Sequence, residues 1–270
     1  MGEHIIVGID DSGPSRSALR WALQRAGSTG ADLVLEHVVD DEWGQLGGDY
    51  AQQETLDGER ILEAALRTSI PSGRSVAATL AHGSPAWTLA REAGPDDLLV
   101  VGSHKTGYLR GRVLGTRSIV VASAARCTVV VVPEDNLSYR HGVVVGVTAD
   151  PACRAAIVAG ALEARRLGQE LSLIHVAPDT SETVETSRAV LASAAELAVA
   201  TAPELVVRRR VSHRRRSDAL LDASRSAMLL VLGESRVDPD RAGFIGSVTH
   251  EVLLNLTSPV MIARSGPSAL

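Results

Sequence analysis

The amino-acid sequence predicts an α/β protein made of two tandem domains, each a doubly wound parallel sheet. Three observations lead to this fold class. Short apolar runs alternate with amphipathic segments, the second half repeats the order of the first, and glycine-rich loops follow the central apolar runs. Because strands and helices alternate throughout, we expect about five parallel strands per domain, with helices on both faces of each sheet.

Five strands and four helices are predicted in the first half of the chain. The strands are expected at 4–9, 33–39, 75–80, 98–101 and 127–132. The helices are expected from Pro14 or Ser15 to Ala26, over 51–69, from Ser84-Pro85 onward, and over 116–125. In the third helix we predict Ser84 as the capping residue and Pro85 as the first helical residue.

The second half of the chain is an internal repeat of the first. Residues 4–19 align with 142–157 at an offset of 138, and 98–102 align with 229–233 at an offset of 131. The pair Gly102 and Gly115 also returns, again thirteen residues apart. The sequence therefore indicates two copies of one α/β unit.

Domain boundaries follow from this repeat at 1–135 and 141–265, with a join too short to be a flexible linker. The fifth strand of each copy, near 128–132 and 259–263, is apolar and lies at a sheet edge in this strand order. An apolar edge strand favours aggregation. We therefore expect the two edges to face each other within one chain as a pseudo-dimer, and further homodimerisation stays open.

Bulk properties predict an ordinary globular protein. The chain has 270 residues, 45% of them hydrophobic, and a net charge of −5. No apolar run approaches the ~20 residues that span a bilayer, and the first strand begins at His4, which leaves no room for a signal peptide. We expect a cytoplasmic protein without membrane contact. Cys127 and Cys153 form no CxxC motif and are interpreted as reduced and buried.

The loop after the fourth strand is a candidate anion site. Four cations lie between Gly102 and Ser118, and no carboxylate does. Glycine lets a ligand approach the backbone, and the helix predicted to start at Thr116 offers free N–H groups that suit a phosphate. The cations are Lys105, Arg110, Arg112 and Arg117.

Taken together, these features resemble the universal stress protein family in its tandem two-domain form, whose loop pattern is G-x2-G-x9-G-[S/T]. The resemblance rests on the first strand ending in Asp10, the strand end His37-Val38, and the loop from Gly102 to Gly115-Thr116. It covers nearly the whole chain, twice. It implies a Rossmann-like, adenine-nucleotide α-hydrolase-like fold that binds ATP or another adenine nucleotide, with Mg²⁺ left open, and has no dedicated catalytic activity.

The resemblance also implies residue roles in the first copy. Ile9, Val38 and Val101 would line the base, and Asp10 would bond the ribose or the adenine side. The phosphates would be held by Gly102, Gly115, Thr116, Arg117 and Ser118. Lys105 stands where the family has a second glycine, so either its ammonium replaces backbone N–H contacts or its side chain fills the site.

In the second copy, the site has changed. Thr148 replaces Asp10, Arg236 replaces Lys105, and the loop 233–249 carries a net charge of −1. We expect this copy to be structural or to bind something other than ATP.

Several residues also have simpler interpretations. For Asp10, the simpler interpretation is that it serves only to form a turn. His37 and His175 are expected to be buried histidines whose ring nitrogens are hydrogen-bonded. The arginines at 208–210 and 214–216 are expected on a solvated strand edge and helix start. A nucleic-acid interface is disfavoured because only 3% of residues are aromatic.

The leading functional hypothesis is a non-enzymatic regulatory or stress-response protein that binds an adenine nucleotide in the first copy, with no catalytic or metal-ligating residues. A second hypothesis is a scaffold that binds no nucleotide and acts through a protein partner, whose identity is open. A third is an ATP-dependent adenylating enzyme, which is disfavoured because SGGxDS and HIGH motifs are missing. Nucleotide co-purification would separate the first two.

Overall fold

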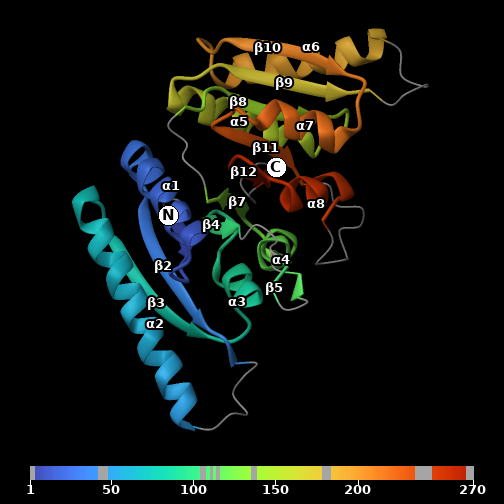
Figure 1. The fold of residues 1–270 in the computed structure, drawn as a ribbon. Helices are drawn as coiled ribbons and strands as arrows, with labels where there is room; N and C mark the ends of the chain where they lie inside the picture. The colour runs from blue at the N-terminus through green and yellow to red at the C-terminus, as the bar shows by residue number, and fades with distance from the viewer. Residues whose placement is uncertain are drawn as a thin grey trace. The chain divides into compact units, whose positions relative to one another are not determined.

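A computed structural model of the chain describes residues 4–41, 48–103, 108–109, 112–113, 116–134, 139–177, 184–234 and 245–265. The described residues form two α/β units, unit 1 within 4–134 and unit 2 within 139–265 (Figure 1). Each unit has a parallel sheet flanked by helices, so the predicted fold class is confirmed.

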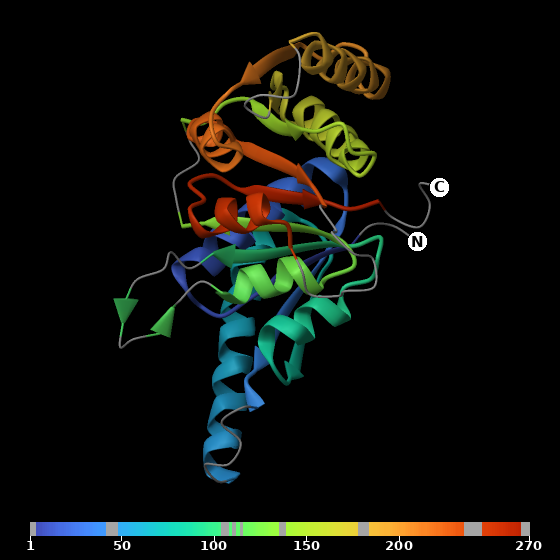
Figure 2. The same cartoon turned by 90° about the vertical axis from the view of Figure 1, so that its right-hand side faces the viewer.

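Unit 1 contains a five-stranded parallel sheet in the order β7-β4-β1-β2-β3. Its strands are β1 (His4–Gly8), β2 (Asp32–Val39), β3 (Val76–His82), β4 (Leu98–Ser103) and β7 (Thr128–Pro133). Its helices are α1 (Gly13–Thr29), α2 (Gly48–Ser69), α3 (Pro85–Glu92) and α4 (Thr116–Ala124), with the short 3-10 turn Ile70–Ser72 after α2. Helices α1 and α2 cover one face, while α3 and α4 pack together on the other, the face nearer the viewer in Figure 2.

Unit 2 repeats this architecture in the order β10-β9-β8-β11-β12. Its strands are β8 (Val143–Val147), β9 (Leu171–Val176), β10 (Val207–Ser212), β11 (Leu229–Gly233) and β12 (Val260–Ala263). Its helices are α5 (Cys153–Leu167), α6 (Val184–Thr201), α7 (Arg216–Ser224) and α8 (Ser247–Leu254). In both units the strand order reverses beside the first strand, between β1 and β4 and between β8 and β11. In doubly wound folds, ligands bind at the carboxyl ends of the strands at this switch point.

The core of each unit lies on its central strands. Leu98, Leu99 and Val100 of β4 are at most 1% exposed, as are Leu229 and Leu230 of β11. Strands buried on both faces need continuous apolar runs rather than alternation, because helices cover both sides of a parallel sheet. This requirement explains why the sequence signal was clearest for these strands.

Three local features differ from the sequence-based expectation. Helix α1 begins at Gly13, earlier than predicted, because Ser12 caps it by accepting a hydrogen bond from the Ser15 amide at 3.1 Å. Ser84 does precede α3, but its side chain makes no capping hydrogen bond. Within the predicted loop, the backbone of β5 (Tyr108–Leu109) pairs antiparallel with β6 (Arg112–Val113).

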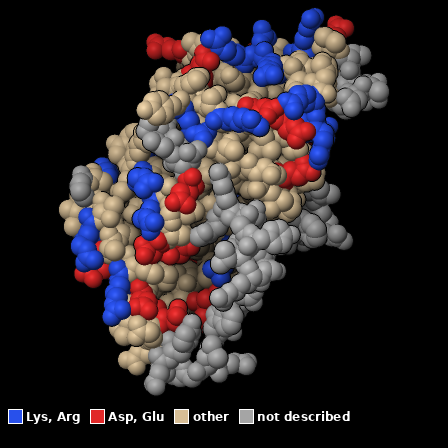
Figure 3. Space-filling model, in the orientation of Figure 1, with Lys and Arg blue, Asp and Glu red and all other residues tan. Residues whose placement is uncertain are grey.

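The arginine run lies where the sequence placed it, on a solvated strand edge. Strand β10 is the terminal strand of the unit 2 sheet, and its arginines at 208–210 are exposed. Arg208 donates to Glu170 at 2.8 Å, and Arg215 donates to Glu251 at 2.6 Å. Figure 3 accordingly shows basic and acidic side chains interspersed on this face of the molecule.

Among the described residues, no helix combines the length and the apolar character that crossing a membrane would require.

Candidate functional site

The candidate site of unit 1 is built on the turn between β1 and α1. Asp10 Oδ1 accepts hydrogen bonds from the amide of Ser12 at 3.1 Å and from its hydroxyl at 2.6 Å. Ser12 in turn caps α1. Asp10 therefore does shape the turn, the simpler role considered from the sequence, and it does so at the carboxyl end of the first central strand.

Ser15 holds this turn from inside the helix. Its hydroxyl accepts from the Asp10 amide at 3.1 Å and donates to the Gly8 carbonyl at 3.4 Å. In unit 2 the thiol of Cys153 takes the same two positions, with the Thr148 amide at 3.5 Å and the Gly146 carbonyl at 3.4 Å. The two units thus share the same pair of contacts at this turn, although the residue that makes them differs.

Gly102 allows α1 to approach the end of β4. A Cβ atom on Gly102 would lie 2.5 Å from the carbonyl carbon of Pro14 and 2.6 Å from the amide nitrogen of Ser15, which real structures do not tolerate. The first turn of α1 therefore lies directly against the β4 strand end. This contact brings a helix N-terminus, with its partial positive charge, to the switch point.

His37 and His175 tie the neighbouring strands together in the two units. His37 Nδ1 lies 2.6 Å from the Ile9 carbonyl oxygen, and His175 Nδ1 lies 2.9 Å from the equivalent Val147 oxygen. The ring of His37 also packs against Gly58 of α2, where a Cβ would come within 2.7 Å of it. Hydrogen bonding is confirmed for both histidines, whereas burial is confirmed only for His175, because His37 is half-buried. Both rings link the ends of neighbouring strands.

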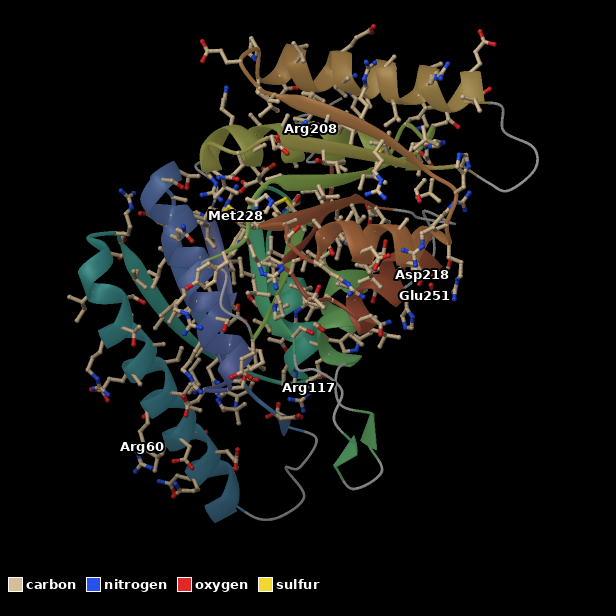
Figure 4. All side chains as sticks on the ribbon, turned by 45° about the horizontal axis from the view of Figure 1, so that its top comes forward. Arg60, Arg117, Arg208, Asp218, Met228 and Glu251 are labelled. Atoms are coloured by element: carbon tan, nitrogen blue, oxygen red, sulfur yellow. The ribbon has the colours of Figure 1, made fainter. Side chains whose placement is uncertain are left out.

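The residues predicted to hold phosphates are only partly described. Ser118 is buried in the first turn of α4, whereas the Arg117 side chain is 69% exposed (Figure 4). Arg117 donates to Asp40 Oδ2 at 3.0 Å, which connects α4 to the end of β2. Thr116 is the first residue of α4, and the structure describes only its backbone. Lys105 and Gly115 lie outside the described residues.

The three residues that the sequence predicts to line the base lie near the carboxyl ends of the central strands. Ile9, Val38 and Val101 are all buried, at 6–8% exposure. Ile9 follows β1, while Val38 and Val101 lie within two residues of the ends of β2 and β4, and these three strands are neighbours in the sheet. The structure thus places the apolar residues of the predicted site at the switch point, next to Gly102.

Unit 2 contains a cavity of about 250 Å³ at the equivalent place. Its lining includes the counterparts of Ile9, Asp10, Val38, Val101, Gly102 and Ser118, which are Val147, Thr148, Val176, Leu232, Gly233 and Thr249. The charges differ from those of unit 1. Thr148 removes the carboxylate of Asp10, Val248 lines the cavity where unit 1 has Arg117, and Glu234 stands at the position of Ser103, bonded to Arg264 at 2.8 Å. The cavity lining is therefore mainly apolar, and its charged residues are Asp150, Arg216 and Glu234.

Glu36 is a buried carboxyl group that the sequence interpretation passed over. It is 3% exposed, and its Oε1 atom has no hydrogen-bond partner in the part of the chain that the structure describes. Burial, assisted by the nearby Glu92 carboxylate, raises the pKa of Glu36 to about 7. A signal was available, because the second copy has Ile174 at this position and lines its cavity with it.

A metal centre is not evident in the described ranges, where no three His, Cys, Asp or Glu side chains gather with a metal-binding arrangement.

The repeated unit with its switch-point site defines a tandem, doubly wound α/β protein. The sequence model of the universal stress protein family matches residues 1–133 and again residues 140–264. The chain therefore belongs to the universal stress protein family and carries two of its domains in tandem.

Relatives of known sequence and structure have the same organisation. A universal stress protein of Mycolicibacterium smegmatis is 29% identical over 287 residues, which cover 96% of each chain. One from Mycobacterium tuberculosis is 29% identical over 291 residues, with the same coverage. The crystal structure of a universal stress protein from Archaeoglobus fulgidus superposes with a TM-score of 0.80 at 17% identity, covering 97% of this chain and 98% of that one.

Proposed function

We propose that this chain is a non-catalytic regulatory protein of the stress-response type that binds an adenine nucleotide in unit 1. The observation that carries the proposal is the close approach of the α1 N-terminus to Gly102 at the switch point. A helix start beside a strand end without a side chain is a favourable environment for a nucleotide phosphate or ribose. The family's loop pattern, retained at Gly102, Gly115 and Thr116 but with Lys105 in place of the second glycine, supports the same assignment.

The division of roles follows from the chemistry at the strand ends. The buried side chains of Ile9, Val38 and Val101 offer an apolar surface for a base. Asp10, exposed on the turn, offers a carboxylate for ribose hydroxyls. Arg117 and Ser118 lie in the first turn of α4, where a phosphate would meet both a cation and a helix start. Mg²⁺, where required, would enter with the phosphates of ATP.

The direct experiment identifies what the protein carries. Protein purified without added nucleotide is extracted with acid, and the released small molecules are identified by chromatography and mass spectrometry. Stripped protein is then titrated calorimetrically with ATP, ADP, AMP and cyclic AMP. We expect at least one adenine nucleotide to bind. No bound nucleotide and no heat of binding across the panel would instead favour the scaffold hypothesis.

A paired substitution tests the position of the site. Asp10→Ala should weaken nucleotide binding by ~1.5–3 kcal/mol, since it removes a charge-assisted hydrogen bond. Thr148→Ala, at the equivalent position of unit 2, should leave the affinity unchanged. Asp10→Asn keeps an oxygen for Ser12 and so separates loss of charge from loss of the turn. Equal affinities of the wild type, Asp10→Ala and Thr148→Ala, measured by calorimetry, would place the site elsewhere.

A further inference from the structure

Glu36 has an unusual environment for a glutamate. Its side chain is 3% exposed, and Oε1 is buried with no hydrogen-bond partner among the described residues. A buried polar atom left without a partner lowers stability, so such atoms are uncommon unless a ligand or another role accounts for them. Unit 2 avoids this cost entirely, because Ile174 takes the equivalent position.

The direction of the Glu36 side chain follows from the alternation along β2. His37 points toward α2, where its ring meets Gly58. Residues Glu36 and Val38 therefore point to the opposite face, on which α3 packs. Their counterparts in unit 2, Ile174 and Val176, both line the cavity at the switch point. Glu36 thus lies on the same face of the sheet as Val38, at the position whose unit 2 counterpart lines the cavity.

The neighbours of Glu36 favour the uncharged form of its carboxyl group. Gly8 and Thr79, opposite it in register on β1 and β3, have no titratable group. On α3, Leu89 lies over Gly8, and Glu92 supplies a negative charge. Burial and this charge raise the pKa of Glu36 to about 7. Near neutral pH a large share of the molecules therefore carries a protonated carboxyl, which has both an O–H donor and a carbonyl acceptor.

We propose that the protonated carboxyl group of Glu36 recognises the adenine base in unit 1, donating to ring nitrogen N1 and accepting from the N6 amino group. This inference rests on the proposed nucleotide site and identifies Glu36 as the residue in it that recognises the base. Adenine presents an acceptor and a donor side by side on this edge, and a neutral carboxyl presents the complementary pair. An ionised carboxylate has no donor for N1, so adenine binding retains a proton on Glu36.

Retention of that proton predicts a specific pH dependence. In the wild type, the affinity for ATP should fall as the pH rises from 6 to 8.5, because the free protein must first regain the proton. The loss should reach about tenfold to thirtyfold over this range, given a free-state pKa of about 7. Glu36→Gln mimics the neutral acid, with one donor group and one acceptor, and should bind ATP with a nearly flat profile.

The experiment compares three proteins by calorimetry with ATP at pH 6, 7, 8 and 8.5. Titration of the ATP phosphates affects all three alike, so the ratio of wild type to Glu36→Gln isolates the side chain. Glu36→Ile, which installs the residue of unit 2, should bind about tenfold more weakly than Glu36→Gln at pH 6. Replacing ATP with its 1-deaza analogue, which lacks N1, should remove the advantage of Glu36→Gln over Glu36→Ile.

The outcomes separate this inference from the function on which it rests. No ATP binding by the wild type at any of these pH values would overturn both. ATP binding with identical pH profiles for wild type and Glu36→Gln would overturn the role of Glu36 alone. The comparison with Glu36→Gln, an isosteric and uncharged change, decides the matter even if Glu36→Ile fails to fold.

Discussion

At the scale of single residues, Glu36 should also make the stability of unit 1 depend on pH. Its folded-state pKa of about 7 lies above the ordinary value of 4.5, so ionisation is harder in the folded protein than in the unfolded one. The contribution of Glu36 to stability is therefore full below pH 4.5 and is lost as the pH rises toward 7. By linkage, the loss amounts to about 3 kcal/mol at most.

Glu36→Gln should abolish this loss, because an amide does not ionise. We expect the free energy of unfolding of the variant to exceed that of the wild type by an amount that grows between pH 4.5 and 7.5. Denaturant titrations of both proteins without nucleotide, at intervals of half a pH unit, measure the difference. A difference that stays constant with pH would show that Glu36 ionises normally in the folded protein.

Individual site residues differ in how far the sequence could predict them. Gly102 was predictable because a strand run ends there at a glycine, and the structure explains the glycine by the contact with Pro14 and Ser15. Glu36 was predictable only in part: its alignment with Ile174 indicates a buried position. Its unpaired carboxyl oxygen follows only from the packing of α3 and the hydrogen bonds of the described residues.

At the scale of elements, the starts of α1 and α3 offer a matched test of helix capping. Ser12 accepts a hydrogen bond from the Ser15 amide, whereas Ser84 occupies the same position without a capping bond. Ser12→Ala should therefore lower the free energy of unfolding by about 1 kcal/mol or somewhat more, since Ser12 also bonds Asp10. Ser84→Ala should change it by only a few tenths of a kcal/mol, within the range of neutral surface changes.

Chemical denaturation of the two variants and the wild type under identical conditions measures these effects. Equal destabilisation by both substitutions would mean that Ser84 caps α3 in solution. The sequence alone could not distinguish the two serines, because a proline follows closely in each case. The difference arises from the local backbone geometry that each turn imposes.

The paired strands of the unit 1 sheet were predictable at the centre and at the edge alike. Strands β1 and β4 are central and largely apolar, and their positions were predicted to within two residues. Strand β3 lies at the sheet edge with mostly exposed side chains and was also predicted to within two residues, since it ends at His82. The β5–β6 pair was missed because its polar, glycine-containing sequence has neither of the periodicities that predict an element.

At the scale of the whole molecule, the two units should differ in ligand binding although their folds agree. In unit 2, Thr148 replaces Asp10, Val248 replaces Arg117, and Glu234 adds a negative charge at the cavity. A nucleotide phosphate would therefore lose the cation that Arg117 supplies in unit 1 and would lie near Glu234, whose charge is paired with Arg264, while Arg216 remains in the lining. We expect calorimetric titration of the stripped chain with ATP to give one bound nucleotide per chain.

A stoichiometry of two with similar affinities would contradict this expectation. Native mass spectrometry of the complex supplies an independent count. Loss of the bound nucleotide in Asp10→Ala but not in Thr148→Ala would assign the single site to unit 1.

The duplication itself was predictable from the sequence, since the constant offsets place the same motifs at the same strand ends. The size of the unit 2 cavity was not predictable from the sequence. Arg264, which binds Glu234, is the residue that follows β12. It lies outside the loop 233–249, on which the sequence comparison of the two sites was based. Such pairings depend on which strand ends become neighbours, and the local sequence pattern does not contain that information.

The exchange of the Ser15 hydroxyl for the Cys153 thiol gives unit 2 a chemical property that unit 1 lacks at this position. Burial raises the pKa of the Cys153 thiol, so the sulfur is held in its less nucleophilic, protonated form. Cys153 nevertheless lines the cavity, within reach of any small alkylating reagent that enters it. The rate of its modification therefore depends on whether a molecule already fills the cavity. The modification rate of Cys153 thus reports whether the unit 2 cavity is occupied, and it can be followed without labelling any other part of that unit.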